Sequence, residues 1–170
     1  LWRLLSERYN NGEFDKKVLV YPGGGYYYDD KEIEGLKAEM AQYQRLGYRI
    51  LKMKIGGADL KTDLKRIDAV LDLVGSGQNL AVDANGKFDL EQAVTFGKAI
   101  EPLDLFWYEE PGDPLDFALH KALVNQYANG ITILSYSRRR NWIWTCILAM
   151  GLFKTFWRKW IFITIKWWCR

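Results

Sequence analysis

The final 40 residues of this sequence contain no acidic side chain, and this absence divides the chain in two. Residues 131–170 hold eight of the 24 lysines and arginines and none of the 21 acids. Residues 1–130 therefore carry 16 bases against 21 acids, a net charge of −5, although the whole chain carries +3. The front of the chain is acidic, which excludes an electrostatic case for nucleic-acid binding by that part.

Cysteine and histidine are scarce. The two cysteines, Cys146 and Cys169, lack the spacing of a zinc or redox pair, and two thiols do not make a disulfide framework. We therefore expect a protein of the reducing cytoplasm. The single histidine, His120, falls within the helical pattern FALHKAL, where a packing or surface role is expected rather than a catalytic one.

Targeting and membrane-spanning segments are also missing. The opening LWRLLSERYNNGEFDKK has no long apolar core or cleavage site. Because no initiator methionine precedes it, we expect the sequence to begin inside a larger protein. The uncharged run at residues 141–153 has 13 residues, too short to span a bilayer. We do not expect a membrane protein.

What the sequence does contain is a repeated strand, loop and helix. Strands are expected at residues 18–21, 48–55, 80–84 and 105–109, and helices at residues 1–9, 30–46, 60–74, 90–100 and 115–127. This pattern is typical of parallel βα units, and near-continuous apolar strands are expected where helices cover a sheet. A doubly wound open sheet and a (β/α) barrel both fit. A full barrel needs about 250 residues, so the chain would supply about half.

Polar side chains follow three successive strands of this pattern. They are Lys52 and Lys54, then Asp83 and Asn85, then Glu109 and Glu110. Side chains two apart on a strand share a face, and the carboxyl ends of parallel strands gather reactive residues. Each pair alone is commonly a solvated strand end or a turn. Their occurrence at three successive strand ends predicts one site.

The chemistry that suits these side chains is removal of a proton beside a carboxylate. Hard oxygen ligands select magnesium, and the ion stabilises the enediolate that forms when the proton leaves. A lysine acts as a base when its pKa is lowered, and a second ammonium or a nearby divalent cation does this. We therefore expect Lys54 to be the base, with Lys52 tuning it and binding the substrate carboxylate.

Three phrases make a resemblance specific. LKMKIGG, AVDANGKF and FWYEEPGDPLD resemble the second, third and fourth barrel strands of the mandelate racemase group of the enolase superfamily. The gaps also fit, with 29 residues from Lys54 to Asp83 and 26 from Asp83 to Glu109. GGYYY, KMKIGG, VDANG and YEEPGDPLD look closest to the D-tartrate dehydratase-like acid-sugar dehydratases. The similarity covers about residues 1–129.

This resemblance implies a fold and a set of roles. The fold is α/β, a partial (β/α) TIM-type barrel of about four βα units without the family's capping domain or its second half. Lys54 corresponds to the catalytic base and Lys52 to its partner. Asp83 and Glu109 correspond to ligands of Mg²⁺, Asn85 lies close to the substrate, and Glu110 lies behind the ligands. The substrate would be a small hydroxy-carboxylate, and the intact family protein a homo-oligomer.

The resemblance stops after residue 129. The family's third metal-binding acid is due about 25 residues beyond Glu109, where the chain reads ITILSYSRRRN without an acid, and the family's later His-Asp pair is absent. We therefore expect a fragment of a tartrate-like dehydratase that is inactive as it stands. The alternatives are a racemase or epimerase of the same superfamily, a non-catalytic remnant, and a membrane-surface binding module.

The tail has an abnormal composition. Residues 131–170 hold six of the eight tryptophans, no proline and one glycine, which fits neither a globular domain nor a linker. We expect a partial barrel domain at residues 1–130 and a tail at residues 131–170 read from a non-native frame. A basic, tryptophan-rich membrane-surface segment is the alternative.

A glycine run precedes three tyrosines near the start of the barrel. Residues 23–25 lack the Gly-Lys-Ser/Thr ending of a phosphate loop, so we expect a turn between a strand and a helix. One of Tyr26, Tyr27 and Tyr28 is expected to face the mouth of the barrel and touch the substrate.

Overall fold

The computed structural model describes residues 2–9, 11–13, 19–28, 33–127, 131–138 and 144–148. The described residues fall into two units, one within residues 1–20 and one within residues 21–152. The first contains helix α1 (Trp2–Tyr9), which confirms the helix expected at residues 1–9. The second contains all the other elements and the site. No described helix is long and apolar enough to cross a membrane.

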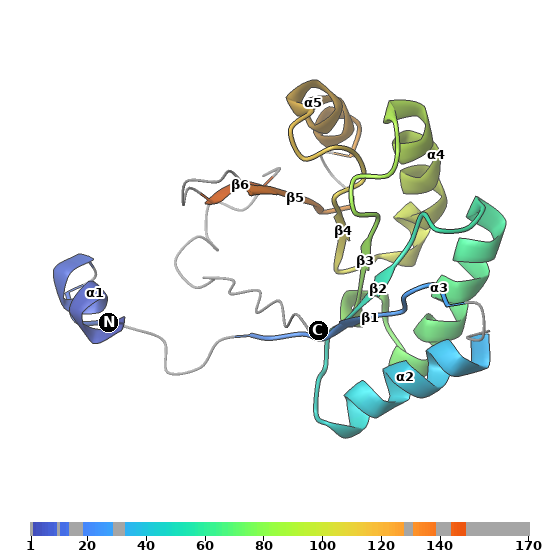
Figure 1. Ribbon diagram of the computed structural model, residues 1–170, viewed down its shortest axis with the longest axis horizontal. Helices are drawn as coiled ribbons and strands as arrows, with labels where there is room; N and C mark the ends of the chain where they lie inside the picture. The colour runs from blue at the N-terminus through green and yellow to red at the C-terminus, as the bar shows by residue number, and fades with distance from the viewer. Residues whose placement is uncertain are drawn as a thin grey trace. The chain divides into compact units, whose positions relative to one another are not determined.

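The second unit alternates strands and helices. Its strands are β1 (Gly23–Gly24), β2 (Leu51–Lys54), β3 (Leu80–Asp83), β4 (Trp107–Glu109), β5 (Ile133–Arg138) and β6 (Trp144–Leu148). Its helices are α2 (Ile33–Arg45), α3 (Leu60–Val74), α4 (Leu90–Ile100) and α5 (Phe117–Gln126), with short 3₁₀ helices η1 (Gly77–Asn79) and η2 (Glu101–Leu103). Helices α2 to α5 follow one another along one side of the strands (Figure 1).

The order of the strands decides between the two expected architectures. Strands β1 to β5 are parallel and neighbour one another in sequence order, and β6 pairs antiparallel with β5. A doubly wound sheet reverses its strand order and places helices on both faces. Sequential order with the helices on one side is the arrangement of a segment of a (β/α) barrel. The partial barrel is confirmed.

The strands present alternate side chains to two different environments. In one row of neighbouring strands, Met53, Val82 and Tyr108 are fully buried in the apolar core with the helices. The adjacent row contains Lys54, Asp83 and Glu109, which point to the other face because successive side chains on a strand alternate. The register therefore holds the polar row in place by burying the apolar one.

The helices begin where short polar side chains can accept their first backbone amides. Asp59 caps α3 by accepting from the Thr62 amide at 3.0 Å. Asp89 and Gln92 form a capping box at the start of α4. Gly75 ends α3 in the left-handed region at φ 73°, which a glycine adopts without steric cost. These caps fix where the loops above β2 and β3 turn into helices.

The first expected strand was placed wrongly. Strand β1 is Gly23–Gly24, inside the glycine run that predicted a turn, and it pairs with Lys52 and Met53. Of the expected strand at residues 18–21, residue 18 lies outside the described residues and residues 19–21 are not in a strand. A Cβ at position 24 would lie 2.5 Å from Glu39 Oε1. A larger residue at this position would require the Glu39 side chain of α2 to move.

The sheet also continues beyond the four expected units. Residues 131–138 include β5, which pairs with β4 through Tyr108 and Glu109. Strand β6 then pairs with β5 over residues 144–148. The four expected βα units, β1–α2 to β4–α5, are therefore present, and β5 adds one parallel strand beyond them. The rest of the tail lies outside the described residues.

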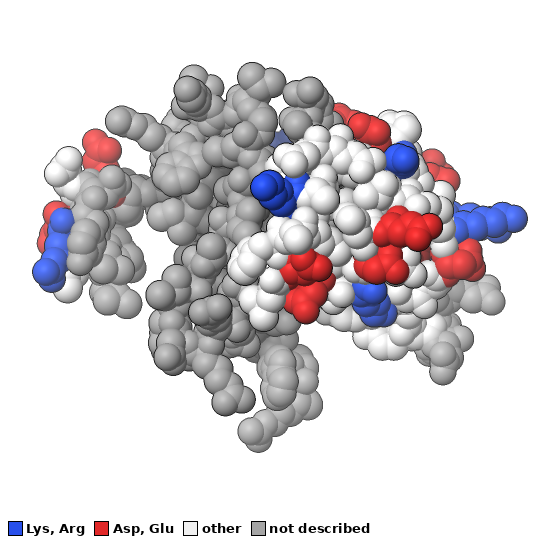
Figure 2. All heavy atoms as spheres, turned by 90° about the horizontal axis from the view of Figure 1, so that it is seen from above, with Lys and Arg blue, Asp and Glu red and all other residues white. Residues whose placement is uncertain are grey.

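Charged side chains of both signs are mixed on the visible face of the second unit. Acidic and basic groups are interspersed with uncharged ones (Figure 2). One exposed ion pair lies on α2, where 3.6 Å separates the Lys37 ammonium nitrogen from the Glu34 carboxylate oxygen. Such exposed pairs contribute little to stability. The ion pairs that matter are buried.

Candidate active site

Four charged side chains meet at the carboxyl ends of β2, β3 and β4. The Lys52 ammonium lies 2.8 Å from Glu109 Oε1 and 3.1 Å from Asp83 Oδ2. The Lys54 ammonium lies 2.6 Å from the same Asp83 oxygen. All four side chains are at most 12% exposed. We call Lys52, Lys54, Asp83 and Glu109 the strand-end cluster.

The pairing register explains why these side chains meet. Lys54 pairs with Asp83, and Asp83 pairs with Glu109, so the three stand side by side on neighbouring strands. Lys52 lies two residues before Lys54 and therefore on the same face. The long lysine side chain reaches both carboxylates from there. The convergence predicted from strand-end positions is present in the structure.

The cluster shifts the titration of its members in different directions. Burial opposes the charged form of Lys52, but the nearby Glu109 and Asp83 carboxylates outweigh it and raise its pKa. Burial also opposes ionisation of Asp83, yet two adjacent ammonium groups keep its pKa below the usual range. The pKa of Glu109 is raised, first by burial and then by the charge of Asp83, against the opposing effect of Lys52. Lys52 therefore remains a cation.

An indole group that the sequence did not single out orients Glu109. The Trp107 indole Nε1 donates to Glu109 Oε2 at 3.0 Å. The Tyr21 ring meets the Trp107 ring edge-on with centroids 5.0 Å apart, and the Lys52 ammonium lies 5.7 Å from the centre of the Tyr21 ring. Trp107 stands two residues before Glu109 on the same strand face. This two-residue spacing is the sequence feature from which the contact between Trp107 and Glu109 could have been predicted.

Asn85 and Glu110 shape the strand ends above the cluster. Both adopt left-handed backbone conformations, with φ of 51° and 43°. The Asn85 backbone amide donates to Asp83 Oδ1 at 2.9 Å, and the Gly86 amide donates to the Glu110 carbonyl at 2.7 Å. Burial, and next the charge of Asp83, raise the pKa of Glu110, while a hydrogen bond from Asn85 opposes them. Non-glycine residues with positive φ are uncommon and cluster at functional sites.

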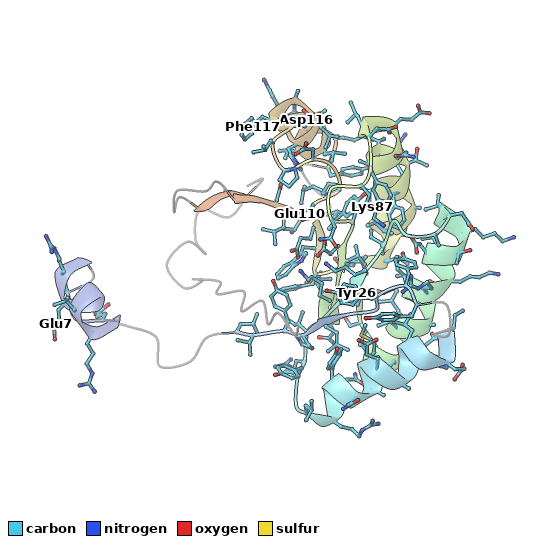
Figure 3. All side chains as sticks on the ribbon, viewed as in Figure 1. Glu7, Tyr26, Lys87, Glu110, Asp116 and Phe117 are labelled. Carbon is cyan, nitrogen blue, oxygen red and sulfur yellow. The ribbon has the colours of Figure 1, made fainter. Side chains whose placement is uncertain are left out.

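Three neighbouring tyrosines lie in the loop after β1, and one of them faces a cluster lysine. The Tyr26 ring centre is 5.6 Å from the Lys54 ammonium, within the distance of a cation–π contact. Figure 3 shows Tyr26 beside β1 and β2, and Glu110 near the end of β4. Tyr27 turns toward α3 instead, where its hydroxyl donates to Asp63. Tyr26 is thus the tyrosine beside the expected base.

The oxygen donors of the cluster are the right chemistry for magnesium but too few. Asp83 and Glu109 supply carboxylates from neighbouring strands, and both are already bound by ammonium groups. The next position along the register is Leu134 on β5. Among the described residues, no group of three or more acid, histidine or cysteine side chains could hold a metal ion. The residues present do not complete an octahedral Mg²⁺ site.

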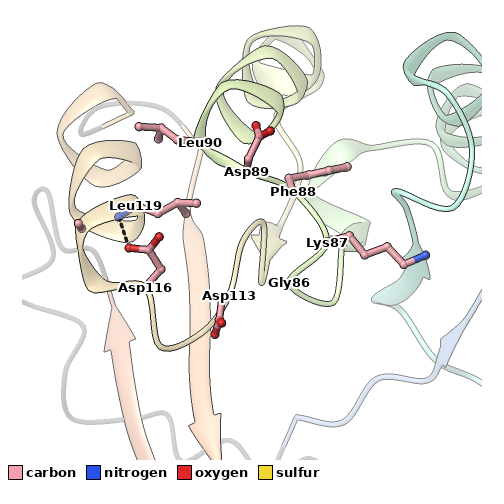
Figure 4. Close-up of a pocket in the computed structure, with 9 residues that line it drawn as sticks. Gly86, Lys87, Phe88, Asp89, Leu90, Asp113, Asp116 and Leu119 are labelled. Atoms are coloured by element: carbon pink, nitrogen blue, oxygen red, sulfur yellow. Dashed lines mark hydrogen bonds between the residues drawn. The ribbon is translucent and has the colours of Figure 1, made fainter.

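An open pocket of about 430 Å³ lies beside the loops after β3 and β4. It is lined by Phe88 and Leu119 together with polar residues that include Asp113 and Asp116 (Figure 4). The two carboxylates are engaged by the backbone, since Asp116 accepts from the Leu119 amide and Asp113 from the Leu115 amide. None of the strand-end cluster lines this pocket. We assign the chemistry to the cluster, where the charged groups are buried and paired.

His120 serves in packing. It is 2% exposed on α5, with Nε2 3.0 Å from the Asp113 carbonyl oxygen and 3.2 Å from Ser135 Oγ. It joins α5 to the loop before it and to β5. The structural role expected from the sequence fits these contacts.

Comparison with known proteins identifies relatives of this arrangement. Residues 35–138 match the family described as Enolase C-terminal domain-like. An arabinonate dehydratase of Saccharolobus solfataricus is 33% identical over 117 residues, which cover 65% of this chain and 31% of that protein. A 3,6-anhydro-alpha-L-galactonate cycloisomerase of Streptomyces coelicolor is 35% identical over 133 residues, covering 77% and 34%. The chain thus spans about a third of these curated relatives.

Solved structures of similar fold include further relatives. A racemase from Streptomyces coelicolor A3(2) with bound magnesium superposes with a TM-score of 0.61 at 34% identity, covering 68% of this chain and 34% of that one. An L-talarate dehydratase from Polaromonas sp. JS666, complexed with Mg and L-glucarate, superposes with a TM-score of 0.60 at 26% identity, covering 78% and 38%. The family match over residues 35–138 includes β2, β3 and β4, the strands that carry the cluster.

Proposed function

Because the chain belongs to the enolase C-terminal domain-like family, we propose that it carries the base-bearing part of an acid-sugar dehydratase site. The relatives include acid-sugar dehydratases, cycloisomerases and racemases. The observation that carries the proposal is the strand-end cluster, in which two lysines and two carboxylates meet on three parallel strands. The substrate class is a small hydroxylated carboxylate of the tartrate type, and the longer enzyme is a homo-oligomer.

The two lysines take different roles. Lys52 keeps its positive charge, because the carboxylates around it raise its pKa, and it binds the substrate carboxylate. The neutral amine form of Lys54 accepts the proton beside that carboxylate and becomes an ammonium, so the carbon–hydrogen bond breaks and its electron pair moves into an enediolate. The β-hydroxyl then leaves as water after taking a proton from a general acid. The resulting enol becomes a 2-keto acid.

Magnesium belongs to the longer enzyme in this proposal. In that enzyme Asp83 and Glu109 would be two of its ligands, and a bound ion would supply positive charge toward a developing enediolate. This chain places Leu134 at the next register position, so the donor set is incomplete. We therefore propose that the chain as it stands is inactive. Slow proton exchange at Lys54 is the one partial reaction that we expect of this chain without the ion.

Turnover assays test the proposal on the purified chain. The protein is incubated with Mg²⁺ and tartrate, arabinonate or galactarate, and 2-keto acid product is followed. We expect no detectable product. Turnover on the order of 1 per second, an ordinary enzymatic rate, would contradict the proposed inactivity.

Deuterium exchange tests the base assignment without requiring dehydration. In D₂O, nuclear magnetic resonance would follow deuterium entering the position beside the substrate carboxylate. We expect slow exchange that Lys54→Met abolishes. Exchange that persists in Lys54→Met would contradict the role of Lys54. Exchange without keto acid in a reconstituted longer enzyme would favour a racemase or epimerase.

The reading frame of the tail is a separate question for the gene. Reading the encoding DNA in all frames past residue 129 tests whether residues 131–170 come from a shifted frame. An alternative frame with an acid near position 134 and a later histidine would support an interrupted dehydratase gene. Its absence would favour a non-catalytic remnant.

A further inference from the structure

A buried charged pair outside the strand-end cluster ties two loops to helix α3. Asp63 and Arg66 lie in the first turns of α3 and are 0% and 9% exposed. Their nearest charged atoms are 3.7 Å apart. Burying charges is costly unless they are paired and hydrogen-bonded. The hydrogen bonds of this pair come from the loops after β1 and β2, and Arg66 Nη1 makes none among the described residues.

Asp63 binds both loops at once. One of its oxygens accepts the hydroxyl of Tyr27, and the other accepts the Gly56 amide at 2.6 Å. Tyr27 comes from the loop after β1 and Gly56 from the loop after β2. Burial, and next the hydrogen bond to Asp63, raise the pKa of Tyr27, so its hydroxyl remains a donor. A single carboxylate thus joins two adjacent loops.

Arg66 contacts the loop after β1 at two further points. Its Nη2 donates to the Gly25 carbonyl at 2.7 Å, and its guanidinium carbon lies 3.8 Å from the centre of the Tyr27 ring. On the other side, the Tyr27 ring packs against Gly57, where an added Cβ would lie 2.4 Å from ring carbons. Tyr27 is held between a cation and a glycine. We call Tyr27, Asp63 and Arg66 the α3 clamp.

The clamp restrains the two residues that flank Tyr26. Tyr26 is 47% exposed, and no described hydrogen bond of its side chain fixes it to the core. Its ring nevertheless lies 5.6 Å from the Lys54 ammonium. The restraints on its backbone are its two clamped neighbours, Gly25 and Tyr27. Because Lys54 sits at the end of β2, joining the two loops sets the distance between this ring and the lysine.

We propose that the α3 clamp is a positioning device that holds Tyr26 against Lys54. Its functional meaning rests on the proposed role of Lys54 as the base. Asp63 and Arg66 touch neither the strand-end cluster nor its carboxylates in any described hydrogen bond or ion pair. They act through the loop. Loss of the clamp leaves the cluster in place and uncovers Lys54.

Competitive acetylation of lysines tests the clamp in the full chain. Trace acetic anhydride labels amines, and peptide mass spectrometry compares Lys54 with the exposed Lys98 on α4 as an internal standard. We expect Tyr26→Leu, Tyr27→Phe and Asp63→Asn each to raise the relative labelling of Lys54. The expected rise is about fivefold, the population change produced by loss of one hydrogen bond in Tyr27→Phe and Asp63→Asn and by loss of one cation–π contact in Tyr26→Leu.

A matched variant separates positioning from general loosening. Tyr43→Phe also removes a tyrosine–carboxylate hydrogen bond, the 3.0 Å bond to Glu39 on α2. We expect it to leave Lys54 labelling unchanged. Equal labelling of Lys54 in the native protein and in Tyr27→Phe would overturn the proposal, as would no change in Tyr26→Leu. If Asp63→Asn does not fold, Tyr27→Phe decides.

The labelling does not depend on the proposed enzyme activity. A protein in which Tyr27→Phe uncovers Lys54, but in which Lys54→Met leaves deuterium exchange unchanged, would retain the clamp and lose the proposed base. The opposite pattern would retain the base and lose the clamp. The two hypotheses therefore fail separately.

Discussion

At the residue scale, the charges of the strand-end cluster compensate one another. Two ammonium groups face two carboxylates, and the side chains are at most 12% exposed. A buried charge left without its partner costs several kcal/mol, whereas a complete pair is close to neutral. The cluster is therefore stable only as a set. Removing one member disturbs all of the others.

Asp83→Asn tests this mutual dependence. Asp83 contacts both ammonium groups, so its loss leaves Lys52 with Glu109 alone and Lys54 without a carboxylate. We expect the free energy of unfolding to fall by about 3 kcal/mol, measured by urea denaturation. The exposed pair of Lys37 and Glu34 provides the control, because Glu34→Gln should change the free energy of unfolding by less than about 0.5 kcal/mol. Equal effects of the two variants would show that the cluster is not energetically special.

Magnesium affinity tests the significance of Leu134. We expect the native chain to bind Mg²⁺ with a dissociation constant above about 1 mM, because two carboxylates do not satisfy octahedral coordination. Leu134→Asp adds a third carboxylate beside Glu109 in the register and should tighten binding at least about tenfold. Calorimetry measures both. Tight native binding that survives Asp83→Asn would contradict the expectation.

At the element scale, close backbone approaches fix where the strands begin. A Cβ at Gly77, in η1, would lie 1.9 Å from the backbone oxygen of Leu103. This contact brings the segment before β3 against the segment before β4, where the Phe106 amide donates to the Gly77 carbonyl at 3.1 Å. The sheet register depends on this approach, which only glycine allows.

Gly77→Ala should therefore be strongly destabilising. The atom that it meets belongs to the backbone and cannot rotate away, so we expect a loss of about 3 kcal/mol, at the upper end of the cost of overpacking. The neighbouring Gln78→Ala removes the bonds from its side chain to Asp104 without a clash. It should cost about 1 kcal/mol. Thermal unfolding that ranks Gln78→Ala as the more damaging change would show that the segments do not meet as described.

The elements also show what sequence reasoning could reach. The ranges expected for α3 and α4 agree with the structure because apolar spacing is a local signal. The strand-end residues were also predictable, because parallel strands bring their carboxyl ends together. The α3 clamp and the bond from Trp107 to Glu109 were not. Those contacts join residues 36 apart in one case and depend on rotamers in the other.

At the scale of the whole molecule, composition and the family match place the boundary between barrel and tail at different residues. A boundary at residue 130 is predicted from composition, whereas the family match extends to residue 138. Strand β5 lies between the two positions. The Tyr108 amide donates to the Thr132 carbonyl at 2.9 Å, and the Glu110 amide donates to the Leu134 carbonyl at 2.8 Å. The edge of the strand that bears Glu109 is thus closed by residues beyond 130.

Truncation distinguishes the two boundaries. A chain that ends at residue 130 leaves the backbone of β4 unpaired beside buried Tyr108 and Glu109, and exposed strand edges invite pairing with other chains. We expect this chain to aggregate in size-exclusion chromatography and to lose cooperative thermal unfolding. A chain that ends at residue 138 keeps β4 paired with β5, so it should aggregate less and unfold more cooperatively than the shorter chain, although it exposes the β5 edge that β6 covers. If the shorter chain unfolds as cooperatively as the longer one, β5 contributes nothing to the barrel, and residue 130 is its true end.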